Sequence, residues 1–218
     1  MKERMSRWRS EAVVISGAGE RLGGRQVEGR QLRGERVASR TVWLKVFQRE
    51  AVKMSDKVWF FHGLESGPHG AKYQRLAEEF EVESPDFQGM DIWERLEKAE
   101  RLTRGEEELV VVGSSFGGLL AALLYERYPE RFRGYVLMAP ALHREEVEEE
   151  IGRMPERAVV IHGVGDEVVP FEPVRAFCEA RGVEEFWAVE DDHRLGASLE
   201  EMVKGVRWVL EVGRRSEV

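Results

Sequence analysis

The sequence predicts an α/β protein with a mostly parallel central sheet that is covered by helices on both faces. Two observations and one general rule of chain connection predict it. From Met54 onward, short apolar runs alternate with longer amphipathic stretches. The apolar runs are nearly continuous, as in strands that are buried on both faces. Strands that alternate with helices are joined by right-handed crossovers, and these make neighbouring strands parallel.

The first elements show the pattern. Val58–Phe61 is an apolar run that ends at a His-Gly pair, with the length and flanks of a buried strand. Apolar side chains at helical spacing predict the next two helices: Tyr73, Leu76 and Phe80 in residues 71–80, and Ile92, Leu96 and Leu102 in residues 91–103. The same criteria predict strands at residues 82–85, 109–112, 135–138, 158–161 and 185–189, and helices at residues 116–127, 144–154, 171–181 and 199–212.

The length and composition describe one globular domain, which we place at residues 54–213 of the 218. No apolar run approaches the roughly 20 residues of a membrane span, and Ala12–Ile15 is too short for the core of a signal peptide. The single cysteine, Cys178, cannot form an internal disulfide or hold a structural zinc ion alone. We therefore expect a cytoplasmic protein with no membrane partner.

The chain has no asparagine and many charged residues, as thermophile proteins tend to have. A GC-rich genome would give much of the same bias. A thermophilic source therefore stays an open expectation, and the sequence gives no prediction of the oligomeric state.

Residues 1–53 differ from the rest of the chain in charge. They hold 13 of the 33 Lys and Arg and 6 of the 41 Asp and Glu, so they are basic while the remainder is acidic. Residues 18–40 are rich in Gly and Arg, so we expect a disordered extension or a misassigned start ahead of Met54. Val13–Ile15 and Val42–Phe47 are the alternative, as two strands that cover the sheet. The segment has no recognisable nucleic-acid module, so no nucleic-acid partner is expected.

The stretch "VVVGSSFGGLL" contains the strand–turn–helix pattern of a nucleophile. Gly113-x-Ser115-x-Gly117 has the G-x-S-x-G spacing, whereas the same reading fails around Ser114. A sharp turn at the serine brings strand and helix close together, so glycine is needed two residues before and after it. The helix N-terminus directs backbone N–H groups toward an oxyanion formed on Ser115.

A serine nucleophile needs a base and an acid that orients the base. Asp166 follows the strand at residues 158–161, and His193 follows the strand at residues 185–189. Reactive groups of such sheets lie beyond the carboxyl ends of the strands, where all three residues are expected. Asp192 is the alternative acid, but it is too close to His193 along the chain for easy approach.

Four segments in order, "FFHGLESGP", "GSSFGG", "HGVGDEVVP" and "DDHRL", resemble the α/β-hydrolase superfamily, and among its members the small lidless bacterial esterase-like hydrolases. The resemblance covers about residues 56–212. It implies that Ser115 is the nucleophile, Asp166 the orienting acid and His193 the general base. It also implies an oxyanion hole from the backbone N–H groups of Leu64 and Phe116.

The other polar candidates fit less well. His62 and His162 are interpreted as structural, and His69 and His143 as loop or surface residues. The five histidines show no metal-binding spacing, so no metal or cofactor is expected. Asp191 and Asp192 are expected to hold their loop, Cys178 to lie in the core or at the surface, and Glu65 and Ser66 are open candidates for substrate contact.

The resemblance implies a serine esterase, and the spacing of the segments limits its substrate. Only 19 residues, 139–157, separate two predicted strands where many relatives insert a lid, so no lid domain fits. An open site favours small, soluble esters or thioesters. Cleavage of a peptide or lactone by the same triad is an alternative, and so is a binding protein that keeps the fold with negligible turnover.

Overall fold

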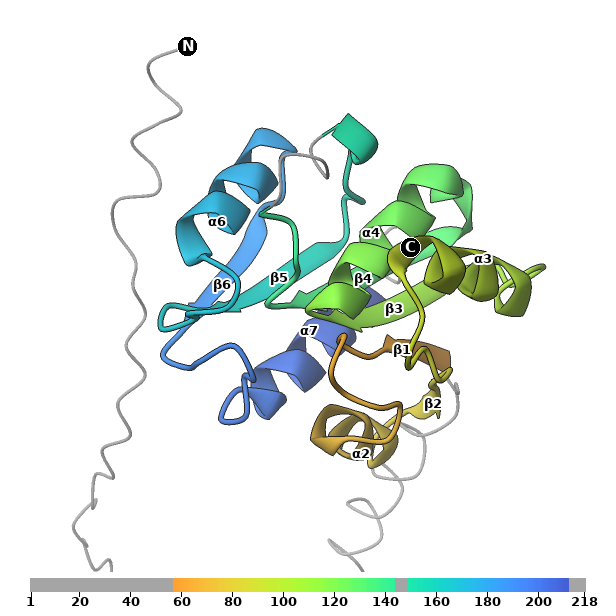
Figure 1. The fold of residues 1–218 in the computed structure, drawn as a ribbon, viewed down its shortest axis with the longest axis horizontal. Helices are drawn as coiled ribbons and strands as arrows, with labels where there is room; N and C mark the ends of the chain where they lie inside the picture. Colours follow the sequence, from red (N-terminus) through yellow and green to blue (C-terminus); the bar gives the residue numbers. More distant parts are fainter. Residues whose placement is uncertain (1–56, 144–148, 212–218) are drawn as a thin grey trace, which may run out of the picture. The chain divides into compact units, whose positions relative to one another are not determined.

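A computed structural model describes residues 57–143 and 149–211. The predictions for residues 1–53, including the strands at Val13–Ile15 and Val42–Phe47, lie outside the described residues. The described residues contain a six-stranded sheet with the order β2-β1-β3-β4-β5-β6, and every neighbouring pair of strands is parallel (Figure 1). The predicted fold class is therefore confirmed.

The elements follow the predicted order. The strands are β1 (Lys57–Phe61), β2 (Glu81–Glu83), β3 (Leu109–Ser114), β4 (Phe132–Met138), β5 (Ala158–Gly163) and β6 (Glu185–Val189). The helices are α2 (Ala71–Ala77), α3 (Ile92–Leu102), α4 (Phe116–Arg127), α6 (Phe171–Ala180) and α7 (Leu199–Glu211), with a 3₁₀ turn, η2, at Pro129–Arg131. None of the helices within the described residues has the length and apolar character needed to cross a membrane.

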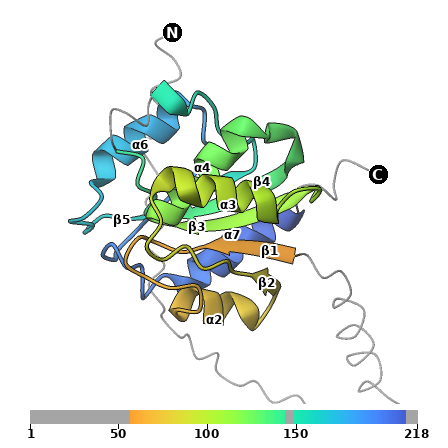
Figure 2. The ribbon, with the colours of Figure 1, turned by 45° about the vertical axis from the view of Figure 1, so that its right-hand side comes forward.

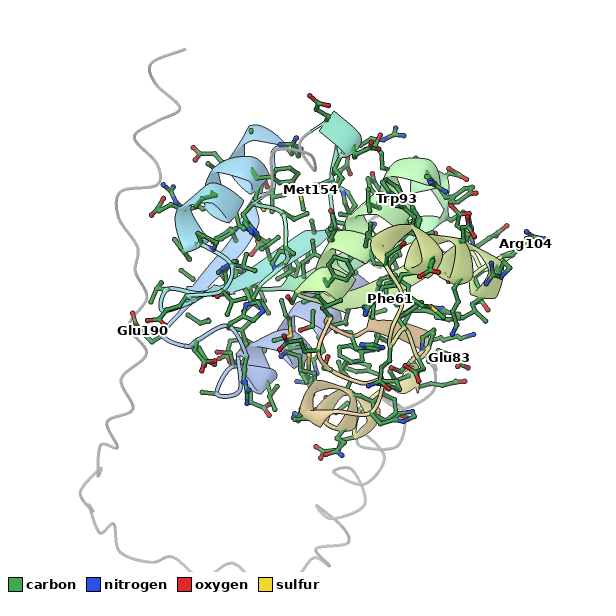
Figure 3. The ribbon with its side chains drawn as sticks, viewed as in Figure 1. Phe61, Glu83, Trp93, Arg104, Met154 and Glu190 are labelled. Atoms are coloured by element: carbon green, nitrogen blue, oxygen red, sulfur yellow. The ribbon has the colours of Figure 1, made fainter. Side chains whose placement is uncertain are left out.

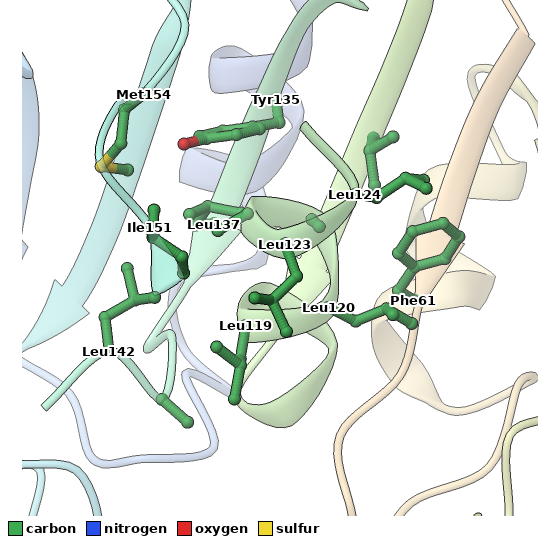
Figure 4. Packing of buried hydrophobic residues seen from close by; sticks show 14 of the residues in the cluster. Phe61, Leu119, Leu120, Leu123, Leu124, Tyr135, Leu137, Leu142, Ile151 and Met154 are labelled. Atoms are coloured by element: carbon green, nitrogen blue, oxygen red, sulfur yellow. The ribbon is translucent and has the colours of Figure 1, made fainter. Parts of the chain in front are cut away.

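Helices cover both faces of the sheet, with α3, α4 and α6 on one face and α2 and α7 on the other (Figures 1 and 2). Successive side chains of β1 alternate between two buried clusters. Trp59 and Phe61 pack under the first three helices, and Val58 and Phe60 pack under the other two. Helix α4 is buried along most of its length, and its residues Leu120 and Leu124 lie beside Phe61 of β1, as the close view shows (Figure 4).

The predicted helix at residues 91–103 is present, but its buried face differs from the predicted one. Leu102 is 46% exposed at the end of the helix, and Arg104 beyond it lies at the periphery of the described residues (Figure 3). Arg95 is instead fully buried, together with Leu96 and Ala99. A charged residue therefore occupies a position on this helix that faces the core.

Two other helices are shorter than predicted. Helix α2 ends at Ala77 rather than at residue 80. Of the helix predicted at residues 144–154, residues 144–148 lie outside the described residues, and residues 151–155 are not helical. Ile151 and Met154 are nevertheless buried in the same cluster as α4.

The carboxyl ends of the strands share one edge of the sheet because all the strands are parallel. The register pairs Phe61 with Gly113 and Gly163 with Val189 near these ends. The loops that follow β1, β3, β5 and β6 therefore meet at this edge. These loops carry Leu64, Ser115, Asp166 and His193, and Phe116 begins the helix that follows Ser115.

Candidate active site

Ser115 lies on a sharp turn between β3 and α4. Its backbone has φ 53° and ψ −112°, in the region that non-glycine residues rarely adopt. Its own N–H donates to the carbonyl oxygen of Met138 at 2.8 Å, and its carbonyl accepts from Ala141 at 3.1 Å. Contacts from the end of β4 therefore hold this turn in its strained conformation.

The flanking glycines allow this turn to form. A Cβ atom on Gly113 would stand 2.5 Å from the carbonyl oxygen of Gly117, and one on Gly118 would stand 2.8 Å from Pro140 Cβ. Gly117 meets the end of β1 even more closely. Side chains at these positions would separate the helix from the strands, as the G-x-S-x-G pattern predicts.

Ser115, His193 and Asp166 are joined by hydrogen bonds. His193 Nε2 lies 3.0 Å from Ser115 Oγ, and His193 Nδ1 lies 2.8 Å from Asp166 Oδ2. A carboxylate only accepts, so Nδ1 carries the proton and Nε2 is free to accept from the serine hydroxyl. The arrangement can remove the proton of Ser115 and stabilise the resulting imidazolium.

Backbone groups of its own loop hold the acid in place. The Oδ1 atom of Asp166, which is itself buried, accepts hydrogen bonds from the N–H groups of Val168 and Val169 at 2.9 and 2.8 Å. The other oxygen, Oδ2, stays available to His193. His162 Nε2 lies 3.3 Å from this second oxygen and donates to the carbonyl of Val169 at 3.0 Å.

Hydrogen bonds to the carboxylates of Asp191 and Asp192 hold the loop that carries His193. The Oδ2 atom of Asp191 accepts from Ala197 N–H at 2.9 Å and from Ser198 Oγ at 2.8 Å, and Asp192 accepts from Arg194 N–H. Burial raises the pKa of Asp191, but these hydrogen bonds outweigh it and leave that pKa below its usual value. Both aspartates hold the loop as predicted, and the carboxylate that contacts His193 is Asp166.

One contact that the sequence did not predict brings the acid loop and the histidine loop together. A Cβ atom on Gly163 would stand 2.4 Å from the carbonyl oxygen of Asp191. The end of β5 and the start of the histidine loop can therefore touch only because residue 163 is glycine. The Gly163-Val164-Gly165 sequence ahead of Asp166 was a sign of such a close approach.

The two residues expected to supply the oxyanion donors lie close to Ser115. Phe116 is the first residue of α4, where a backbone N–H has no acceptor within the helix. Leu64 follows Gly63, and a Cβ atom on Gly63 would stand 3.6 Å from Ser115 Cβ. The segment after β1 therefore lies against the serine.

The other candidates occupy the places that the sequence suggested. His62 and His162 are fully buried, and burial lowers the pKa of each. His69 is exposed and its ring packs against Tyr73. Cys178 lies in the core, where burial raises its pKa to about 12. Among residues 57–143 and 149–211, no three His, Cys, Asp or Glu side chains are grouped so that they could hold a metal ion.

The parallel sheet, the strained serine turn and its hydrogen-bonded histidine fit the α/β-hydrolase fold. The family model for the alpha/beta hydrolase fold matches residues 59–161. The chain has the fold of the α/β-hydrolase superfamily.

Solved structures agree with this family. A Xanthomonas campestris protein assigned to the hydrolases of the α/β superfamily is 28% identical, with a TM-score of 0.59 over 72% of this chain and 95% of that one. Mouse alpha/beta hydrolase domain-containing protein 10 is 16% identical, with a TM-score of 0.60 over 72% and 90%. A monoacylglycerol lipase of Paleococcus ferrophilus is 16% identical, with a TM-score of 0.53 over 70% and 93%. No protein among the curated sequences matches the chain.

Proposed function

We propose that the protein is a serine hydrolase that cleaves small carboxylic esters or thioesters through an acyl-enzyme. The observation that carries the proposal is the hydrogen-bonded series Ser115–His193–Asp166, which begins on a strained turn at the carboxyl edge of the sheet. A serine hydroxyl is a weak nucleophile unless a base accepts its proton, and His193 Nε2 lies within reach of it.

The reaction proceeds in two halves. In the first half, Ser115 Oγ attacks the carbonyl carbon while its proton moves to His193 Nε2, and Asp166 stabilises the imidazolium through Nδ1. The backbone N–H groups of Leu64 and Phe116 hold the tetrahedral oxyanion. The proton on Nε2 then passes to the leaving alcohol or thiol, which departs and leaves the acyl group on Ser115.

In the second half, His193 takes a proton from water, and the water oxygen attacks the acyl carbon. A second tetrahedral oxyanion forms in the same hole. It collapses to the free acid when the proton returns to Ser115 Oγ. The cycle needs no cofactor, because each proton transfer uses His193.

The proposed substrate is small because the segment between β4 and β5 is too short to enclose a large one. Between β4 and β5 the chain has only residues 139–157, without room for a lid domain. The segment after β1 also leaves Leu64 57% exposed. A site of this kind does not exclude water from a long acyl chain.

Two measurements test the proposal. The purified protein should hydrolyse p-nitrophenyl acetate, with turnover that falls as the acyl chain lengthens, and Ser115 should be labelled by a fluorophosphonate probe. A protein without turnover or labelling would be a binding protein on the same fold, and the proposal would be wrong.

A further inference from the structure

Arg95 is a buried cation that the proposed mechanism leaves unused. Its side chain is fully buried on α3, and its guanidinium donates only to main-chain carbonyl oxygens within the described part of the chain. Its Nη2 atom is buried without a hydrogen-bond partner among the described residues. Within the described residues the only carboxylate that interacts with this cation is Asp86, at longer range than a salt bridge. Burying a charge that is not directly paired is costly, and an apolar residue would fill this core position at lower cost. Its presence therefore calls for a role other than packing.

The guanidinium holds the segment that follows β1. Its Nη1 atom donates to the carbonyl oxygen of His62 at 3.1 Å and approaches that of Gly63 at 3.4 Å. The Nδ1 atom of His62 also donates to the Gly63 oxygen, at 2.8 Å. That histidine tautomer is fixed because Nε2 accepts from the N–H of Phe87 at 2.8 Å. The Gly63 carbonyl is thus anchored by two buried donors.

Anchoring this carbonyl also sets the direction of the Leu64 N–H. The described residues contain no cis peptide bond, and in a trans peptide the C=O and the N–H point in opposite directions. The Leu64 N–H therefore points away from the guanidinium that holds the Gly63 oxygen. The His62 carbonyl also lies against the serine turn, since a Cβ atom on Gly117 would stand 2.8 Å from it.

Arg95 also contacts the residue that carries the second expected donor. The guanidinium carbon lies 5.0 Å from the centre of the Phe116 ring, in the range of a cation–π contact. Its Nε atom donates to the carbonyl of Met90 at 3.2 Å, which ties the side chain to the segment just before its own helix. One side chain therefore supports the segments on both sides of Ser115.

We infer that Arg95 is a positioning residue for the oxyanion hole, which fixes the Gly63–Leu64 peptide and Phe116 so that their N–H groups converge on the oxyanion. The inference rests on the proposed function, because the hole acts only if Ser115 forms a tetrahedral adduct. Arg95 touches no reacting atom. Its effect is therefore expected on the stabilisation of the oxyanion and not on the binding of the ester.

The test compares Arg95→Met, Arg95→Lys and the control Leu96→Ala in the full chain. A trifluoromethyl ketone is the probe, because its adduct with a serine carries an oxyanion like that of the reaction. Arg95→Met should lower kcat for p-nitrophenyl acetate by about 10- to 100-fold with little change in KM, and the inhibition constant of the ketone should rise by the same factor. Arg95→Lys should lose less activity and less affinity for the ketone than Arg95→Met, because an ammonium group can still donate to one carbonyl.

The control separates positioning from stability. Leu96 is the buried neighbour of Arg95 on the same helix, so Leu96→Ala should lower the melting temperature while the ketone keeps its affinity below that temperature. If Arg95→Met folds and binds the ketone as tightly as the wild type does, the inference is wrong. If Arg95→Met does not fold, wild-type ketone affinity in Arg95→Lys overturns it equally.

The two proposals fail in different ways. A wild-type protein that hydrolyses the ester and is labelled at Ser115, with Arg95 variants that behave like Leu96→Ala, overturns the positioning role alone. A wild-type protein with neither turnover nor labelling overturns the proposed function and this inference together.

Discussion

Gly117 lies so close to the end of β1 that a Cβ atom on it would stand 2.0 Å from the carbonyl oxygen of Phe61. No real side chain is accommodated at that distance. Helix α4 therefore docks on β1 only because residue 117 is glycine, and this docking places Ser115 beside the segment that carries Leu64.

Gly117→Ala should strongly destabilise the protein. The new methyl group must push α4 away from β1, and overpacking of this kind costs about 1–3 kcal/mol or more of unfolding free energy. Urea denaturation measures the loss. The control is Gly152→Ala, since a Cβ atom there meets nothing within 4 Å. Equal unfolding free energies for the two variants would contradict the close contact.

Ser115→Ala should abolish fluorophosphonate labelling and lower kcat by several orders of magnitude, because no other hydroxyl lies on the strained turn. Ser114→Ala is the matched control. Ser114 is the last residue of β3, paired in the sheet with Met138, and its replacement should keep most of the activity. Labelling that survives in Ser115→Ala, or an equal loss in both variants, would remove Ser115 from the role of nucleophile.

Asp166→Asn should lower kcat by about 10⁴, because an amide can donate to His193 Nδ1 and so favours the wrong tautomer. The backbone N–H groups of Val168 and Val169 can still donate to the amide oxygen, so the fold should persist. Asp192→Asn should cost far less, since that carboxylate accepts from the backbone of Arg194. Steady-state kinetics and far-UV circular dichroism check both statements, and a larger loss in Asp192→Asn would reassign the acid.

The free energy of unfolding should fall as the pH drops below about 6.5, the ordinary pKa of histidine. Burial lowers the pKa of His62 and of His162, so below this pH the unfolded chain binds more protons than the folded chain. The contribution of these two histidines to the free energy of unfolding is therefore complete above pH 6.5. It falls on acidification by up to about 1.4 kcal/mol for each histidine and each pH unit.

Chemical denaturation at pH 7.5 and 5.5 measures this loss. His162→Phe should reduce the difference between the two values, because the ring keeps its stacking on Phe186 but no longer titrates. His69→Gln, a change at an exposed histidine, should leave the difference as in the wild type. A loss of stability that is the same in all three proteins would show that other groups cause it.

The sequence predicted the order of the elements, and it predicted that Ser115, Asp166 and His193 lie at one edge of the sheet. Both predictions rest on apolar runs and strand-end motifs, which are local features of the chain. It did not predict that Arg95 is buried, since a charged residue on an amphipathic helix is expected on the solvated face. The contact of Gly163 with the histidine loop was also missed. Both depend on segments far apart in the chain, which a local pattern does not report. The cytoplasmic location and the thermophilic source remain predictions from composition.

Every strand in the sheet pairs with a segment distant in the chain. The nearest paired residues, such as Leu109 with Phe132 and Tyr135 with Ala158, are 23 positions apart, and Val58 pairs with Val110 across 52. No hairpin can therefore start the sheet. The long segment between two paired strands must lose conformational entropy before the first interstrand hydrogen bond forms. Refolding is accordingly expected to be slow for a protein of this size, with unpaired strand edges exposed meanwhile. The yield of active protein should then depend on the concentration at which the chain is refolded.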